Sequence, residues 1–189
     1  NNTMKKIILS LISIFLLFPL WAEQIVIKSP DNNLVVSLFL ANGSLNYNVT
    51  YKEKTILEDS PLGMITNVSD FSRNLVFVEK NTQTIHKTYQ EPKIKKSNVT
   101  YNANEVTAIY KTEQDEKISL IFRVSNNDIA FKYALSQNGE TARCIIEKEL
   151  TGFNFPIFTT TFLTPQAPPM IGWMKTKPSY EEEYVTDEP

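Results

Sequence analysis

Cysteine, histidine and glycine are scarce in this sequence, and each shortage removes a class of site. The 189 residues include one cysteine, one histidine and five glycines. A single cysteine, Cys144, cannot form an internal disulfide or a thiolate metal cluster, and its place in an alternating stretch predicts a small buried strand residue. His86 has no second histidine or cysteine nearby, so we expect a strand or surface histidine rather than a metal ligand or a catalytic base.

Motifs of several large enzyme classes are also missing. The sequence holds no G-x-S-x-G, no glycine-rich phosphate loop and no H-E-x-x-H. Serine hydrolases of that type, kinases and zinc proteases therefore lack the residues on which their catalysis depends. The formal net charge of −2 offers no polycation, so a nucleic-acid partner is not expected.

The first 22 residues have the order of an export signal. Lys5 and Lys6 supply positive charge, residues 7–20 are apolar, and Ala22 is a small residue suited to cleavage. The apolar run is shorter than the roughly 20 residues of a membrane span, and no cysteine follows it, so no stable membrane anchor is expected. We predict a signal peptide over residues 1–22 and a secreted or periplasmic bacterial protein. A buried apolar helix is the alternative.

From residue 24 onward, apolar and polar residues alternate with a period of two, which is typical of antiparallel strands with one wet face. Turn residues recur at intervals of about ten residues, as at Asn42-Gly43, Lys52–Lys54 and Asn126–Asp128. No amphipathic helix is indicated after the signal. The pattern predicts an all-β fold, an antiparallel β-sandwich. The alternating apolar positions are Leu34, Val36, Leu38, Leu40, Leu45, Tyr47, Val49, Tyr51, Val106, Ala108, Tyr110, Ile118, Leu120, Phe122, Val124, Ile129, Phe131, Tyr133 and Leu135.

Two stretches depart from this alternation. Residues 81–97 are polar and less periodic, and the lysines among them predict a solvated loop rather than a nucleic-acid patch. After Phe155, prolines at positions 156, 165, 168, 169 and 178 interrupt any long strand. We expect this last part of the chain to be irregular.

Acidic and aromatic side chains concentrate near the end of the sequence. Glu181, Glu182 and Glu183 follow Tyr180, with Trp173 a few residues before them. Adjacent carboxylates repel one another, and a face exposed to water is their simplest setting. The alternative is a Ca²⁺ site, since calcium takes about six to eight oxygen ligands. An extended segment turns Glu181 and Glu183 to one face, so the run supplies at most half of such a site.

The mature chain resembles the N-terminal region of glycoside hydrolase family 97, a family of exported bacterial α-glucosidases and α-galactosidases. Each matching segment is weak alone, but the segments follow one another in the order of the family. They are Ser29–Leu34, Ser60–Gly63, Phe122–Val124 with Asn127–Tyr133, Glu149–Phe155, and Trp173–Tyr184.

This resemblance implies a mutarotase-like β-sandwich over residues 23–189, incomplete at its C-terminal end. In the whole enzyme a (β/α)₈ barrel carries catalysis, and repeated strand–helix units are not seen in this sequence. The catalytic carboxylate pair would lie in that missing barrel, so no catalytic residue is assigned here and this chain alone is expected to be inactive. The family also holds a Ca²⁺ ion between sandwich and barrel. Glu181 resembles the ligand from the sandwich, with Glu182 and Glu183 as register alternatives.

On this interpretation the whole enzyme acts on oligosaccharides, as an α-glucosidase or an α-galactosidase, and the sandwich contacts the barrel of its own chain. A second hypothesis is a non-catalytic carbohydrate-binding sandwich in which Trp173 and Tyr180 stack on a sugar. A third is an exported scaffold domain.

Overall fold

A computed structural model describes residues 24–90, 98–136 and 143–161, and all ten strands in these ranges pair antiparallel. One four-stranded sheet has the order β1 (Ile25–Lys28), β2 (Leu34–Ala41), β3 (Ser44–Tyr51) and β4 (Lys54–Pro61). The second has the order β6 (Val76–Gln90), β7 (Asn98–Lys111), β8 (Lys117–Ser125) and β9 (Ile129–Leu135). A two-stranded sheet pairs β5 (Met64–Thr66) with β10 (Ile146–Glu149). Within the described ranges no helix is long and apolar enough to cross a membrane.

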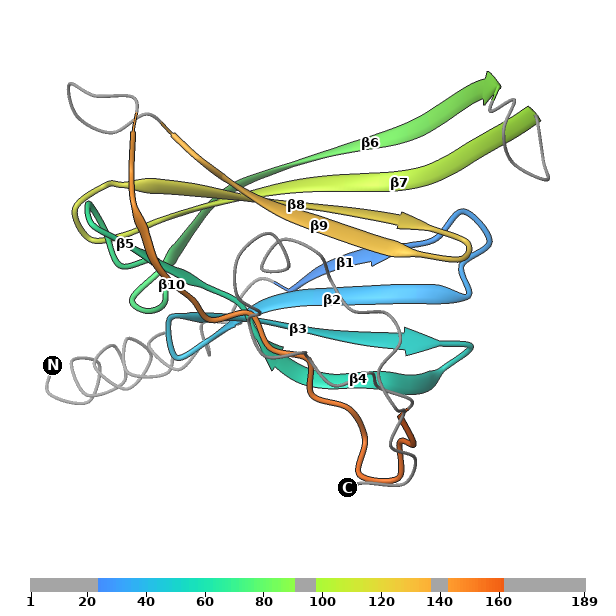
Figure 1. Cartoon of the computed structure of the whole chain (residues 1–189), viewed down its shortest axis with the longest axis horizontal. Coiled ribbons are helices and arrows are strands. Elements are labelled where there is room, and N and C mark those ends of the chain that lie inside the picture. Colours follow the sequence, from blue (N-terminus) through green and yellow to red (C-terminus); the bar gives the residue numbers. More distant parts are fainter. Residues whose placement is uncertain (1–23, 91–97, 137–142, 162–189) are drawn as a thin grey trace, which may run out of the picture. The chain divides into compact units, whose positions relative to one another are not determined.

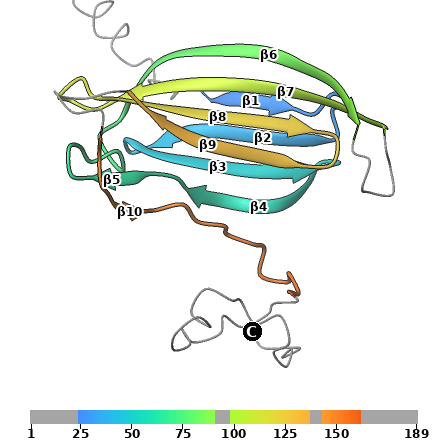
Figure 2. The ribbon, with the colours of Figure 1, turned by 45° about the horizontal axis from the view of Figure 1, so that its top comes forward.

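The two larger sheets lie face to face and enclose one apolar core (Figures 1 and 2). The predicted antiparallel β-sandwich is therefore confirmed. All ten strands belong to one compact unit, residues 1–154. Residues 155–189 form a second unit, in which the Thr159 amide donates a hydrogen bond to the Pro156 carbonyl (2.8 Å).

Alternation along each strand determines which side chains form the core. Tyr47 on β3 lies against two aromatic rings of the opposite sheet, with centroids 5.8 Å from Phe122 and 5.9 Å from Phe131. Leu34, Val36 and Leu38 on β2 and the alternating positions of β7 and β8 are buried as predicted. Leu40 is only partly buried, and Tyr51 at the end of β3 is 40% exposed. Each fully buried large side chain contributes about 1.5–3 kcal/mol from burial alone, so this aromatic contact is a major part of the core.

Two hairpin turns of the first sheet use positive backbone angles with little glycine. Asn42 and Gly43 between β2 and β3 have φ of 51° and 77°, and Lys52 and Glu53 between β3 and β4 have φ of 48° and 65°. Positive φ at both central residues is the geometry of a type I′ turn, whose twist matches that of the strands it joins. The predicted turns at both places are confirmed.

The prediction of a loop over residues 81–97 is wrong for residues 81–90, which belong to β6. This strand pairs with β7 without interruption from Glu79 as far as Gln90 opposite Asn98, and the two strands continue past the ends of β8 and β9 (Figure 1). Most of its side chains are exposed on both faces. With no buried face, the sequence shows no apolar period there. Backbone pairing with β7 holds the strand, and side-chain hydrogen bonds such as that of His86 with Asn102 add to it. Residues 91–97 lie outside the described residues.

The prediction that Cys144 is a buried strand residue is also wrong. Cys144 is exposed and precedes β10, which begins at Ile146. All four residues of β10 are exposed, because among the described strands it pairs only with β5 and it adds no residue to the core. His86 is an exposed strand residue, as predicted, and its Nδ1 atom is hydrogen-bonded to Oδ1 of Asn102.

Candidate functional site

The segment after β10, residues 150–154, returns along the end of β4 and is here named the return strip. Backbone hydrogen bonds join its alternate residues to the sandwich. The Leu150 amide donates to the Gly63 carbonyl (2.9 Å), and the Gly152 amide donates to the Pro61 carbonyl (2.9 Å). The Asn154 carbonyl accepts a bond from the Glu58 amide (2.8 Å). The return strip is thus tied to the sandwich as far as Asn154.

A buried tyrosine, Tyr47, and a partly buried one, Tyr133, add side-chain hydrogen bonds to the return strip. The Tyr47 hydroxyl donates to the Gly152 carbonyl (3.2 Å), and the Tyr133 hydroxyl is hydrogen-bonded to Oγ1 of Thr151 (2.9 Å). The Gly63 amide also donates to the Tyr133 hydroxyl (3.1 Å). Burial raises the pKa of both phenols above the ordinary value of 10.0. Both therefore stay protonated near neutral pH and act as hydrogen-bonding groups that position the strip, not as bases.

Gly152 lies where a side chain does not fit. A Cβ atom at this position would stand 2.8 Å from both Cγ and Cδ of Pro61. Gly152→Ala is therefore expected to destabilise the fold by about 1–3 kcal/mol, the typical cost of overpacking. Urea unfolding followed by circular dichroism measures this cost. Because the clash is with the proline ring, the double variant Pro61→Ala/Gly152→Ala should recover part of the loss. Equal stability of Gly152→Ala and the wild type would contradict this contact.

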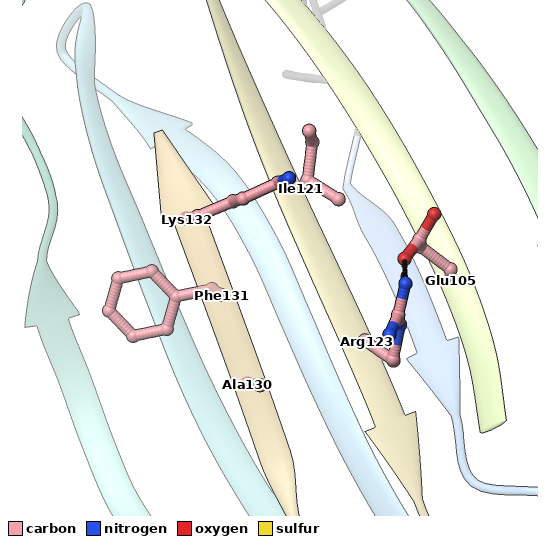
Figure 3. A pocket seen from close by; sticks show the side chains of 6 residues that line it. All are labelled: Glu105, Ile121, Arg123, Ala130, Phe131 and Lys132. Atoms are coloured by element: carbon pink, nitrogen blue, oxygen red, sulfur yellow. Dashed lines mark hydrogen bonds and ion pairs between the residues drawn. The ribbon is translucent and has the colours of Figure 1, made fainter. Parts of the chain in front are cut away.

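A pocket of about 170 Å³ lies on the β7–β9 part of the second sheet, lined by Glu105, Ile121, Arg123, Ala130, Phe131 and Lys132 (Figure 3). Glu105, Arg123 and Ala130 are register partners on three neighbouring strands. Their neighbours in sequence, Val106 and Phe122, are core residues. Alternation therefore turns the charged side chains to the face away from the core.

Glu105 is the carboxylate that lines this pocket, and its side chain is 9% exposed. Nε of Arg123 donates to its Oε2 atom (2.8 Å), Nη2 of Arg123 donates to the same oxygen, and Nε2 of Gln83 donates to Oε1. Burial raises the pKa of Glu105, but the bonds from Gln83 and Arg123 outweigh it, and the pKa lies below the ordinary 4.5. The carboxylate stays ionised and fully engaged near neutral pH. It is suited to hold Arg123 in place, not to donate a proton as an acid catalyst.

The candidate site residues of the sequence, Trp173, Tyr180 and Glu181–Glu183, lie outside the described residues. Among residues 24–90, 98–136 and 143–161, no three histidine, cysteine, aspartate or glutamate side chains are grouped as a metal site requires. Sequence reasoning did not find the Glu105–Arg123 pair. In the sequence, Glu105 and Arg123 are charged residues at polar positions of two segments in which apolar and polar residues alternate. Whether they pair depends on the register between the two strands.

The family described as Glycosyl-hydrolase 97 N-terminal matches residues 27–189. A probable retaining α-galactosidase of Streptomyces bingchenggensis (strain BCW-1) is 24% identical over 123 residues, which are 62% of this chain and 19% of the relative. The crystal structure of a β-arabinopyranosidase is similar with a TM-score of 0.81 and 49% identity, over 88% of this chain and 27% of that one. A family 97 enzyme of Pseudoalteromonas sp. strain K8 in complex with panose has a TM-score of 0.65 and 24% identity, over 70% and 20%.

Together the sandwich and these matches define a β-sandwich domain of a glycoside hydrolase. The chain spans about a fifth to a quarter of the length of these relatives. It belongs to glycoside hydrolase family 97, and it corresponds to the N-terminal domain of that family.

Proposed function

We propose that this chain is the N-terminal sandwich of an exported glycoside hydrolase that acts on sugars with the ring configuration of galactose. The observation that carries the proposal is the 49% identity to a β-arabinopyranosidase over 88% of the chain. The α-galactosidase relative points to the same ring. β-L-Arabinopyranose and α-D-galactopyranose share the configuration of the anomeric carbon and of the ring hydroxyls, and differ by the C6 hydroxymethyl group. Of the two activities expected from the family resemblance, α-glucosidase and α-galactosidase, this proposal favours the second.

In this proposal the sandwich supports catalysis without supplying a catalytic residue. Glu105 is ionised and engaged by Arg123, and Tyr47 and Tyr133 are held protonated. The family's catalytic carboxylates are placed in the barrel, which the sandwich would contact within the same chain.

Hydrolysis of nitrophenyl glycosides by the full-length enzyme tests the proposed substrate class. The β-L-arabinopyranoside and the α-D-galactopyranoside are expected to be hydrolysed with a higher kcat/KM than the α-D-glucopyranoside. The missing C6 hydroxymethyl group changes kcat/KM by roughly 10–200-fold if only apolar contacts are lost, and by roughly 10⁴–10⁵-fold if the site hydrogen-bonds its hydroxyl. The ratio between the two favoured substrates therefore shows which kind of contact the site makes with C6. Preference for the glucoside would reverse the assignment. Hydrolysis by the 189-residue chain alone would contradict the placement of catalysis outside the sandwich.

We propose further that Glu181 contributes a ligand to a calcium ion shared with the barrel, on the strength of the family resemblance. When bound, calcium would polarise the sugar or its leaving group. Glu181→Ala in the full-length enzyme is expected to weaken the apparent calcium affinity by at least about tenfold, as perturbation of metal sites commonly does. Isothermal titration with Ca²⁺ measures this affinity independently of hydrolysis. Glu182→Ala and Glu183→Ala are the matched controls. A loss confined to one of them would move the ligand to that position.

Export is proposed on the basis of the signal pattern in residues 1–22. Cleavage after Ala22 is expected to leave Glu23 as the first residue of the secreted protein, and mass spectrometry of the N-terminal peptide measures it. Recovery of the uncleaved N-terminus from the cytoplasmic fraction would contradict export.

A further inference from the structure

The outer edge of β6 is the feature from which a second interaction follows. β6 spans 15 residues and lies at the end of its sheet, with β7 as its neighbour among the described strands. A bulge lies between Phe77 and Glu79, and from Glu79 onward the strand is regular. Along this part the side chains are exposed, except that of Ile85, which is partly buried. Figures 1 and 2 both show β6 at the margin of its sheet. An exposed regular edge presents unpaired N–H and C=O groups that can pair with another strand.

The charges on this edge are complementary to themselves. Glu79, Gln83 and Lys87 are spaced four residues apart, so all three side chains lie on the same face of the strand. Glu79 and Lys87 are eight residues apart, which is roughly 26 Å along a strand, so they cannot pair within one copy. In an antiparallel pair of two β6 strands with Gln83 opposite Gln83, Glu79 of each copy lies opposite Lys87 of the other. Opposite charges at such cross-strand positions stabilise the pair.

We propose that two copies of this chain associate through their β6 edges, antiparallel, with Gln83 on the two-fold axis. Centring the axis on Gln83 also aligns the full length of both strands, because residue 83 is the midpoint of Val76–Gln90. Registers centred on Asn81, Thr82 or Thr84 place Glu79 opposite Gln83, Ile85 or Tyr89 and forfeit both ion pairs. The partner is therefore a second copy in one defined register. The β6–β9 sheet of one copy and the β6–β9 sheet of the other become one sheet of eight strands.

The polar row on the outer face agrees with this axis. Gln83 donates a hydrogen bond to Glu105, which holds Arg123 on the next strand. The two-fold axis generates the same row of three side chains in the second copy. Gln83 of one copy therefore meets Gln83 of the other, and no like charges come together at the centre of the dimer. A two-fold interface of this kind is isologous, which allows it to close as a dimer instead of growing into a filament.

Size-exclusion chromatography with light scattering on the full-length protein, over a concentration series, tests the proposal. The wild type is expected to reach twice its monomer mass. Glu79→Lys and Lys87→Glu, each alone, place like charges opposite each other and are expected to shift the protein to the monomer. The double variant Glu79→Lys/Lys87→Glu restores opposite charges and should recover the dimer. A monomeric wild type, or a dimer that ignores both single variants, would overturn the proposal.

Disulfide trapping checks the register independently of charge. In a Cys144→Ser background, Gln83→Cys is expected to form an intermolecular disulfide under mild oxidation, seen as a reducible dimer band. Thr88→Cys is the matched control, because the proposed register separates two copies of residue 88 by roughly 33 Å. Equal cross-linking of both variants, or of neither, would exclude Gln83 from the axis. Unchanged circular dichroism of each variant confirms that it is folded.

Discussion

Replacing Phe122 with alanine is expected to lower the free energy of unfolding by about 3–5 kcal/mol, the usual cost of deleting a fully buried aromatic side chain. Phe122 is 0% exposed and stacks on Phe131 at 5.0 Å between ring centroids. Its ring also lies 5.8 Å from that of Tyr47 on the opposite sheet. The substitution removes the ring at the centre of the contact between the two sheets. Urea unfolding followed by far-ultraviolet circular dichroism measures the loss.

Phe158→Ala is the matched control for this prediction. Phe158 is 94% exposed, so the same chemical change removes no buried surface, and its expected effect is within about 0.5 kcal/mol. Similar losses for both variants would show that the effect comes from the residue type and not from the core. Both variants delete the same atoms, so a larger loss of stability for Phe122→Ala than for Phe158→Ala must come from the burial of Phe122 in the core.

Replacing Arg123 with alanine is expected to cost about 2 kcal/mol. The change leaves the buried carboxylate of Glu105 without the guanidinium that holds it. Removing one partner of a fully buried ion pair costs about 3–5 kcal/mol, and the Arg123 side chain is 35% exposed, which reduces the loss. Lys132→Ala, on the same face but exposed, is expected to change stability by less than about 0.5 kcal/mol.

The pH dependence of the Arg123→Ala effect distinguishes lost charge pairing from lost packing. Because the folded-state pKa of Glu105 is lowered, the pairing stabilises the fold above the ordinary value of 4.5 and is lost as the pH falls through the folded pKa. The difference between Arg123→Ala and the wild type should therefore be full near neutral pH and shrink in acid. A difference that stays constant with pH would assign the loss to packing. In the double variant Glu105→Gln/Arg123→Ala the loss should be smaller, because no buried charge is left unpaired.

Strand periodicity predicted those parts of the fold in which one face is buried. Leu120, Phe122 and Val124 alternate in the sequence because every second side chain of β8 enters the core. The sequence also predicted the turn at Asn42-Gly43, since these residues accept positive φ. The sequence did not predict that β6 continues beyond residue 80, because a strand exposed on both faces has no hydrophobic period. Cys144 was misplaced for a related reason: a short edge strand buries nothing, so apolar residues near it do not indicate a core.

The candidate site was less predictable than the fold because it depends on register. Glu105 and Arg123 are 18 residues apart, and only the pairing of β7 with β8 brings them opposite each other. The same holds for Gly152, whose neighbour Pro61 lies far away in sequence. The family resemblance identified the enzyme class that composition alone could not indicate. The proposed calcium ligand Glu181 remains a prediction from that resemblance.

The order of strands in the two large sheets has a consequence for synthesis of the chain. Among the described strands, each sheet is a run of strands consecutive in sequence, β1 to β4 and then β6 to β9, with no strand exchanged between them. The first sheet can form its hairpins while the second is still being translated. Its apolar face, with Val36, Leu38 and Tyr47, then waits for β7 and β8. At about 5–20 residues per second, that face stays open to solvent or to a chaperone for several seconds, during which the nascent chain is most exposed to capture.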